Sequence, residues 1–245
     1  MFPIKNTVAT RYPPVATWCL IFANCAVFLF EAGLGPRELN WFLNSYALVP
    51  ARYFVPYSRG HATDLIDYLP FVTNTFLHGG WLHLILNMWT LWLFGGAVED
   101  RLGHGRYVVF YFSCGVLASA AHALFNPGST VPALGASGAI AGIMGAYVSM
   151  FPLARIIVVV PIVFIPLFFE WPAILFVGIW FVLQLLQGTV DLLTPSTGAG
   201  VAWWAHVGGF LAGLVLAPVL RRPQRYHRPY YPDEGVLGFD PWGRR

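Results

Sequence analysis

Charged residues are scarce in this sequence. Only 10% of its 245 residues are Asp, Glu, Lys or Arg, whereas 57% are hydrophobic. Soluble domains carry roughly a quarter charged residues, so the deficit indicates lipid as the main solvent. The basic residues form no stripe with interleaved aromatics outside the C-terminal tail, so no nucleic-acid partner is predicted.

Cysteine is also rare, and metal-binding patterns are missing. Cys19, Cys25 and Cys114 lie in apolar stretches, so we interpret them as small hydrophobic residues and not as a disulfide framework. No Cys/His spacing is typical of a zinc site, and the sequence has neither the His-Glu-x-x-His of a metalloprotease nor the paired intramembrane aspartates of an aspartyl protease. We therefore predict no metal and no cofactor.

Long apolar runs dominate the remainder. A hydrocarbon core of ~30 Å requires about 20 helical residues at ~1.5 Å each. The candidate spans cover residues 14–34, 81–98, 106–125, 137–151, 170–190 and 201–220. We predict an all-α integral membrane protein in which residues 14–220 form a six-transmembrane-helix bundle in the lipid bilayer.

The flanking segments are more polar. The first apolar run follows Lys5 and Arg11 as a signal peptide would, but no small-x-small cleavage site follows Glu31, so we treat this run as a transmembrane helix. Residues 1–13 are predicted to be an N-terminal tail. Residues 35–80 form a long first loop, and the Arg-, Pro- and Tyr-rich residues 221–245 are predicted to be a disordered tail.

One further apolar segment, Ile156 to Phe169, contains Pro161 and Pro166. Prolines at this spacing disfavour one straight helix, so we predict an interfacial or re-entrant segment and not a seventh span.

The basic residues predict the orientation. With six spans and a cytoplasmic N-terminus, the long first loop is extracytoplasmic and carries three basic residues, Arg37, Arg52 and Arg59. The other basic residues then lie on the cytoplasmic side, as the positive-inside rule requires. Both termini are therefore predicted to be cytoplasmic, in a multi-pass protein of the plasma membrane.

The fourth span is short. From Ser137 to Phe151, before Pro152, it extends only about 22 Å at ~1.5 Å per residue. Its cytoplasmic end is anchored near Arg155, so Ser137 should lie below the outer surface, facing a water-filled pocket. The helix N-terminus there offers free N–H groups that could stabilise an oxyanion. Serine is equally a common N-cap, and Ala139 breaks the G-x-S-x-G pattern of soluble hydrolases.

His206 lies a few residues inside the sixth span, where an ionisable residue is costly and indicates function. Small residues on both helices are expected to allow close packing, namely Gly138, Gly142 and Gly145 on the fourth span and Gly209 and Gly213 on the sixth. Because these two helices are parallel, Ser137 and His206 can meet at one depth, with His206 as general base. A histidine satisfied by a backbone carbonyl is the structural alternative. Glu31, Glu170 and Asp191 lie only at span ends, so we predict a dyad and not a triad.

His83 and Asn87 lie four residues apart on one face of the second span. Both should point into the bundle, where they either complete an oxyanion hole with the Ser137 N–H or form an interhelical hydrogen-bond pair. Glu99, at the cytoplasmic end of the same span, is expected to belong to a solvated helix end.

These residues resemble the rhomboid family of intramembrane serine proteases. The match runs, in order, from His78-Gly-Gly-Trp-Leu-His83-Leu-Ile-Leu-Asn87 and Gly95-Gly96-Ala97-Val98-Glu99 to Gly135-Ala136-Ser137-Gly138 and Ala205-His206-Val207-Gly208-Gly209 with Gly213. It covers about residues 70 to 215. The family's Trp-Arg pair is absent from the first loop.

The resemblance implies a six-helix core and an endopeptidase that cleaves transmembrane protein substrates in or beside their spans. It implies Ser137 as nucleophile, His206 as base, and His83, Asn87 and the Ser137 amide as oxyanion stabilisers. A catalytically silent relative that binds membrane clients is the alternative from another class. A transporter is disfavoured because no repeated halves with broken helices occur.

Overall fold

The computed structural model describes residues 2–55, 64–162, 165–193 and 201–221. The elements in chain order are β1 (Phe2–Asn6), α1 (Val15–Ala32), α2 (Pro36–Tyr46), α3 (Ala51–Phe54), η1 (Leu65–Tyr68), α4 (Pro70–Thr73), η2 (Asn74–Phe76), α5 (Trp81–Leu102), α6 (His104–Phe125), α7 (Ser137–Met150), β2 (Arg155–Ile162), β3 (Ile165–Pro172), α8 (Ala173–Leu193) and α9 (Trp203–Leu220). The predicted C-terminal tail, 221–245, lies outside the described residues except for Arg221.

The prediction of a helical membrane protein is confirmed. Among the described residues, α1, α5, α6, α8 and α9 are long and apolar enough to cross a membrane, and the shorter α7 is also apolar. Each predicted span overlaps one of these helices, with ends that differ by a few residues. That α7 also crosses the membrane, as the fourth of six spans, stays a prediction.

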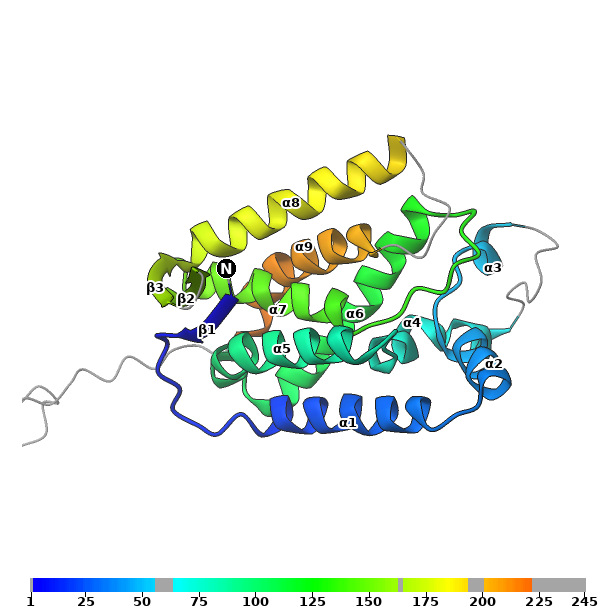
Figure 1. The fold of residues 1–245 in the computed structure, drawn as a ribbon, viewed down its shortest axis with the longest axis horizontal. Helices are drawn as coiled ribbons and strands as arrows, with labels where there is room; N and C mark the ends of the chain where they lie inside the picture. The colour runs from blue at the N-terminus through cyan, green and yellow to red at the C-terminus, as the bar shows by residue number, and fades with distance from the viewer. Residues whose placement is uncertain (1, 56–63, 163–164, 194–200, 222–245) are drawn as a thin grey trace, which may run out of the picture.

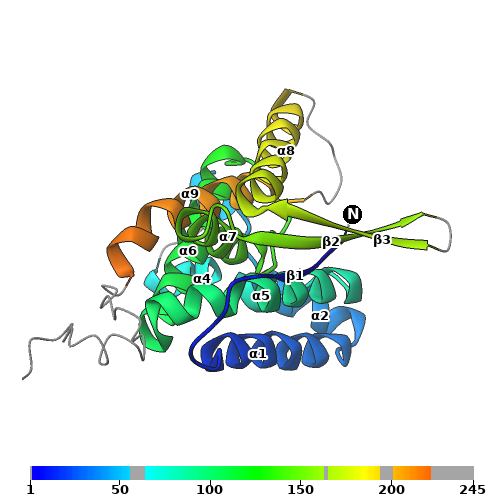
Figure 2. The same ribbon diagram turned by 90° about the vertical axis from the view of Figure 1, so that its left-hand side faces the viewer.

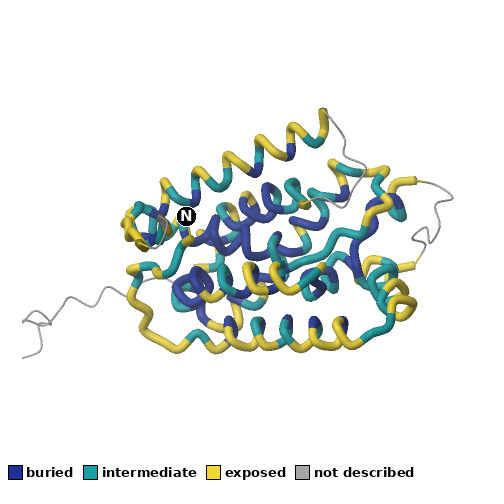
Figure 3. Tube along the Cα trace, in the orientation of Figure 1, coloured by how far each residue is buried: buried dark blue, intermediate teal, exposed yellow. Residues whose placement is uncertain are grey.

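The helices form a bundle around α7, as Figure 1 shows. Most residues of α7 are buried, whereas α1 and α8 lie on the outside and expose long apolar faces (Figure 3). Phe22 on α1 is 76% exposed and Val215 on α9 is 68% exposed. Apolar side chains around the whole perimeter are expected where lipid is the solvent.

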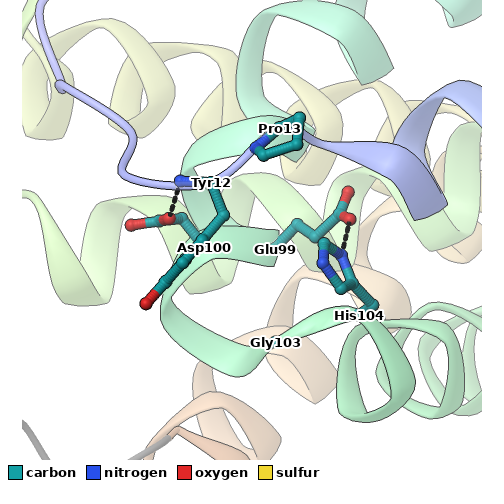
Figure 4. Close-up of a pocket in the computed structure, with 6 residues that line it drawn as sticks. All are labelled: Tyr12, Pro13, Glu99, Asp100, Gly103 and His104. Atoms are coloured by element: carbon teal, nitrogen blue, oxygen red, sulfur yellow. Dashed lines mark hydrogen bonds and ion pairs between the residues drawn. The ribbon is translucent and has the colours of Figure 1, made fainter.

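The expectation of a solvated helix end at Glu99 is wrong. This side chain is only 1% exposed, and its carboxylate accepts hydrogen bonds from the Ala16 and Thr17 N–H groups and from the Thr17 hydroxyl. His104 Nδ1 lies 2.5 Å from the same carboxylate, beside a cavity of about 140 Å³ (Figure 4). Glu99 therefore caps the positive end of α1, which has no side-chain cap of its own.

A three-stranded antiparallel sheet, in the order β1-β2-β3, was not predicted. It lies at the end of the bundle opposite α2 and α3 (Figure 1), and its hairpin projects sideways from the helices (Figure 2). In the described parts of the segment from Ile156 to Phe169, β2 and β3 pair with Pro161 opposite Pro166, which confirms that the segment is not one straight helix. Its interfacial or re-entrant placement stays a prediction. Part of the predicted N-terminal tail, 1–13, is also ordered as a strand, because β1 pairs with β2.

The first loop contains short helices in its described part and packs against the segment that precedes α7. Leu48 and Ala133 exchange two backbone hydrogen bonds, of 3.0 and 2.7 Å. The Gly135 N–H donates to the Asn74 carbonyl at 2.9 Å, and the Asn74 side chain donates to the Ser119 hydroxyl on α6. The loop therefore fixes the backbone immediately before Ser137.

Candidate active site

Ser137 is the first residue of α7, where no preceding turn supplies acceptors for the backbone N–H groups. Gly135, two residues earlier, has φ +122°, a conformation that favours glycine. A Cβ at Gly135 would lie 2.8 Å from the His83 ring. Glycine is thus required both by the turn into α7 and by the close approach of α5.

Ser137 and His206 are within hydrogen-bonding distance. The Ser137 hydroxyl lies 2.8 Å from His206 Nε2, although the two residues are 69 positions apart in the sequence. His206 is only 9% exposed, and Ser137 is of intermediate burial. The imidazole is positioned to accept the serine proton, as a general base must.

The small residues explain how α7 and α9 approach so closely. A Cβ added to Gly209 would collide with the Gly138 carbonyl, and one added to Gly213 would collide with the Gly142 carbonyl. A Cβ at Gly145 would collide with the Phe210 carbonyl. The same face also meets α6, because a Cβ at Gly138 would lie 2.6 Å from the Ala118 Cβ. Backbone contact between these helices keeps Ser137 and His206 at one depth.

Asn87 and His83 lie on the other side of the segment that leads to Ser137. The site at which a Gly135 Cβ would stand is 2.8 Å from His83 Nε2 and 3.6 Å from Asn87 Nδ2. Asn87 is 6% exposed, and its Nδ2 has no hydrogen-bond partner among the described residues. Its donor is therefore free for a group that enters beside Ser137.

The first turns of α5, α7 and α9 meet at this site. His83 is the third residue of α5, Ser137 the first of α7 and His206 the fourth of α9. Each helix N-terminus carries a partial positive charge, so the three together favour negative charge between them. The arrangement suits an anion that forms during a reaction.

One site residue was missed in the sequence. The Gln184 side chain of α8 is 6% exposed, and its Oε1 lies 2.7 Å from His206 Nδ1. No carboxylate completes a triad with His206 in the described contacts, yet the imidazole has a second polar partner besides Ser137. An amide in the middle of an apolar span was the signal that could have identified Gln184.

Two cavities formed by the described residues lie elsewhere. One is the Glu99 cavity of Figure 4, and the other, of about 480 Å³, lies in the first loop beside Arg52 and Asp67. Neither is lined by Ser137 or His206. The water-filled pocket at Ser137 therefore stays a prediction.

Comparison with known proteins places these features in one family. The family model of the Rhomboid domain matches residues 67–223, more than half of the chain. Presenilin-associated rhomboid-like protein A, mitochondrial, of Danio rerio is 32% identical over 120 residues, which are 47% of this chain and 31% of that protein. Rhomboid protease GluP of Bacillus subtilis is 43% identical over 75 residues, 31% of this chain and 14% of that protein.

A third relative matches over a longer stretch. Rhomboid protein 1, mitochondrial, of Saccharomyces cerevisiae is 26% identical over 220 residues, which are 85% of this chain and 54% of that protein. The chain thus spans about half or less of the length of each of these three relatives. Because the Rhomboid domain covers most of its membrane helices, this chain belongs to the rhomboid family of intramembrane serine proteases.

Proposed function

We propose that this protein is an intramembrane serine endopeptidase that uses Ser137 as nucleophile and His206 as general base. In this mechanism His206 Nε2 accepts the proton of the Ser137 hydroxyl as its oxygen attacks a peptide carbonyl. The same imidazole then donates that proton to the leaving amine, and water hydrolyses the acyl-enzyme. The observation that carries the proposal is the 2.8 Å separation of the Ser137 hydroxyl and His206 Nε2.

The oxyanion that forms in the first step is held by Asn87, His83 and the Ser137 N–H. The unpartnered Asn87 Nδ2 and the proximity of both side chains to Gly135 support these roles. Such donors act best in a site that excludes bulk water, where each is worth several kcal/mol of transition-state stabilisation, on the order of 10²–10³ in rate.

The substrates are transmembrane proteins, cleaved in or beside their spans. We propose that both termini of this chain are cytoplasmic and that the Ser137 end opens to the extracytoplasmic side, which the distribution of basic residues supports. Two of the three relatives above are named as mitochondrial proteins, so they lend no support to the plasma membrane as the compartment.

A fluorophosphonate probe tests the proposal, because it reacts with an activated serine without any helical substrate. The purified protein should be labelled and should cleave a model transmembrane substrate. Both activities should disappear in Ser137→Ala and in His206→Ala. Ser149→Ala is the matched control, since Ser149 is exposed at the far end of the same helix and donates only to the Ala146 carbonyl.

The opposite results would contradict the proposal. Labelling that persists in Ser137→Ala would place the nucleophile elsewhere. A folded wild-type chain that is neither labelled nor active would favour a silent relative that binds membrane clients.

A further inference from the structure

Gln184 lies between two fixed partners. It is in the middle of α8, and its Oε1 is 2.7 Å from His206 Nδ1 on the neighbouring α9. On its other side, Nε2 donates to the Trp180 carbonyl of the preceding turn at 3.2 Å. A primary amide has one acceptor oxygen and one donor nitrogen, so both ends of this side chain are engaged.

The Trp180 carbonyl determines which way the amide points. A carbonyl oxygen can only accept, so the end of Gln184 that faces it must be the NH₂ group. The end that faces His206 must then be the oxygen, which can only accept. It follows that His206 Nδ1 carries a proton, whichever way the amide is first assigned.

A neutral imidazole carries one proton. With that proton on Nδ1, the lone pair is on Nε2, which is the nitrogen 2.8 Å from the Ser137 hydroxyl. This is the tautomer that a general base for Ser137 needs. In the other tautomer Nε2–H would point its proton at the hydroxyl and could not accept one.

We propose that Gln184 is a positioning residue that holds His206 in the Nδ1–H tautomer, so that Ser137, His206 and Gln184 form one hydrogen-bonded chain in which only His206 exchanges a proton with Ser137. The inference rests on the protease function proposed above and adds a third member to it. In the described part of the chain, the Gln184 side chain hydrogen-bonds to His206 and to the Trp180 carbonyl and not to Ser137, so its role is exerted through the imidazole.

A neutral amide suits this place in the membrane. An aspartate in the same role would bring a charge into an apolar span, and a buried charge is costly unless fully paired. An amide oxygen accepts the Nδ1 proton without net charge, and its NH₂ group is satisfied by its own helix. The polar partner is therefore obtained at a lower desolvation cost.

Gln184→Met tests the role, because methionine has a similar length and shape but no comparable acceptor. The rate of fluorophosphonate labelling of Ser137 should fall roughly 10- to 100-fold, the effect of losing a buried hydrogen bond. Turnover of a transmembrane substrate should fall by a similar factor through kcat, with KM little changed. Gln184→Glu, which keeps an oxygen acceptor, should retain more labelling than Gln184→Met.

Gln187→Met is the matched control on the same helix. Gln187 is exposed, one turn along α8 from Gln184. Its replacement should leave the labelling rate and the Tm unchanged. Equal labelling rates in wild type and Gln184→Met, with both chains folded by Tm, would overturn the inference.

The tautomer itself provides a readout that needs no activity. In ¹⁵N-histidine-labelled protein, the His206 signals, identified by their loss in His206→Gln, should show the Nδ1–H tautomer. In Gln184→Met the population should shift toward Nε2–H. A wild-type His206 in the Nε2–H form would overturn the role of Gln184, whereas a wild-type chain without Ser137-dependent labelling would overturn the protease function.

Discussion

Asn87 keeps a buried amide donor without a partner among the described residues, although such a group costs about 1–3 kcal/mol. Asn74, thirteen residues earlier in the sequence, shows the usual alternative, because its amide donates to the Ser119 hydroxyl at 2.8 Å. An unsatisfied donor beside the proposed nucleophile is expected where function, and not stability, determines the residue.

We therefore predict opposite effects for these two asparagines. Asn87→Ala should lower kcat on a transmembrane substrate by roughly 10²–10³, since one proposed oxyanion donor is lost, while the Tm stays level or rises. Asn74→Ala should lower the Tm, because it leaves the Ser119 hydroxyl without its donor. Kinetics and thermal unfolding in detergent check both. A fall in Tm without loss of kcat in Asn87→Ala would mean a purely structural hydrogen bond.

His78, between the first loop and α5, is predicted to make stability depend on pH. Burial, with a smaller contribution from the nearby His83, lowers the pKa of His78 to about 4, and its ring lies 5.1 Å from the His83 ring. The unfolded chain then binds a proton at this residue below about pH 6.5, which the folded chain does not bind until about pH 4. Stability contributed by neutral His78 is present above pH 6.5 and is lost as the pH falls through this window.

Thermal unfolding as a function of pH measures this effect. The wild-type Tm should fall between pH 6.5 and 4 more steeply than that of His78→Asn. Parallel curves for the two proteins would show that His78 does not contribute to the pH dependence.

At the scale of elements, the contact between α7 and α9 determines the geometry of the site. These helices meet through glycines, and no side chain separates the Gly138 and Gly142 carbonyls from Gly209 and Gly213. In lipid, helices associate through such close packing, because burial of apolar surface between them gives little gain.

Gly209→Ala should therefore lower stability by roughly 1–3 kcal/mol and reduce activity, because the added methyl group forces α9 away from α7. Gly178→Ala in α8 is the matched control, since nothing lies within 4 Å of its added Cβ, and it should be neutral or slightly stabilising. Unfolding in mixed micelles and fluorophosphonate labelling measure both properties. Identical behaviour of the two variants would contradict the role of this contact.

The unpaired backbone groups of the sheet restrict where in the membrane it can lie. β3 is an edge strand, and its outward groups have no partner strand among the described residues. Hydrocarbon cannot satisfy such groups, so we predict that the hairpin lies at the membrane surface and not in the core. Its exposed Phe168 and Phe169 are then suited to the boundary between headgroups and acyl chains.

At the scale of the whole molecule, the two ends of the bundle have different tasks. The end with Ser137 gathers three helix N-termini and the first loop, whereas the other end holds the sheet and the Glu99 cap of α1. Each terminus of α1 meets one of these ends through a glutamate. Glu99 of α5 caps the first turn of α1, and Glu31, in the last turn of α1, accepts the His78 N–H. The orientation of this axis decides which side of the membrane receives the product.

Labelling from one side of the membrane tests the orientation. In intact cells, a membrane-impermeant maleimide should label Arg37→Cys, at the start of α2, because that position is predicted to be extracytoplasmic. Arg106→Cys, in the first turn of α6 at the opposite end, should react only after permeabilisation. Both arginines are exposed, and the native chain, with its three cysteines in α1 and α6, provides the background. The reverse pattern would contradict the predicted topology.

The sequence alone was enough to predict where the helices lie and that Ser137 and His206 stand at the same depth in the bundle. Apolar run length, prolines and glycines act locally, so they mark where α1, α5, α6, α7, α8 and α9 begin and end. Counting the spans then made α7 and α9 parallel, which placed their first turns at the same end of the bundle.

Tertiary structure alone decided which faces meet. Helix α8 is apolar on most of its surface and carries two amides, Gln184 and Gln187, so its sequence does not reveal which of them turns from lipid to protein. In the sequence Glu99 looks like a surface charge, because only the tertiary fold brings the N–H groups at the start of α1 to its carboxylate. The sheet depends on pairing between Phe2–Asn6 and a hairpin about 150 residues away, and long-range backbone pairing leaves little trace in local sequence patterns.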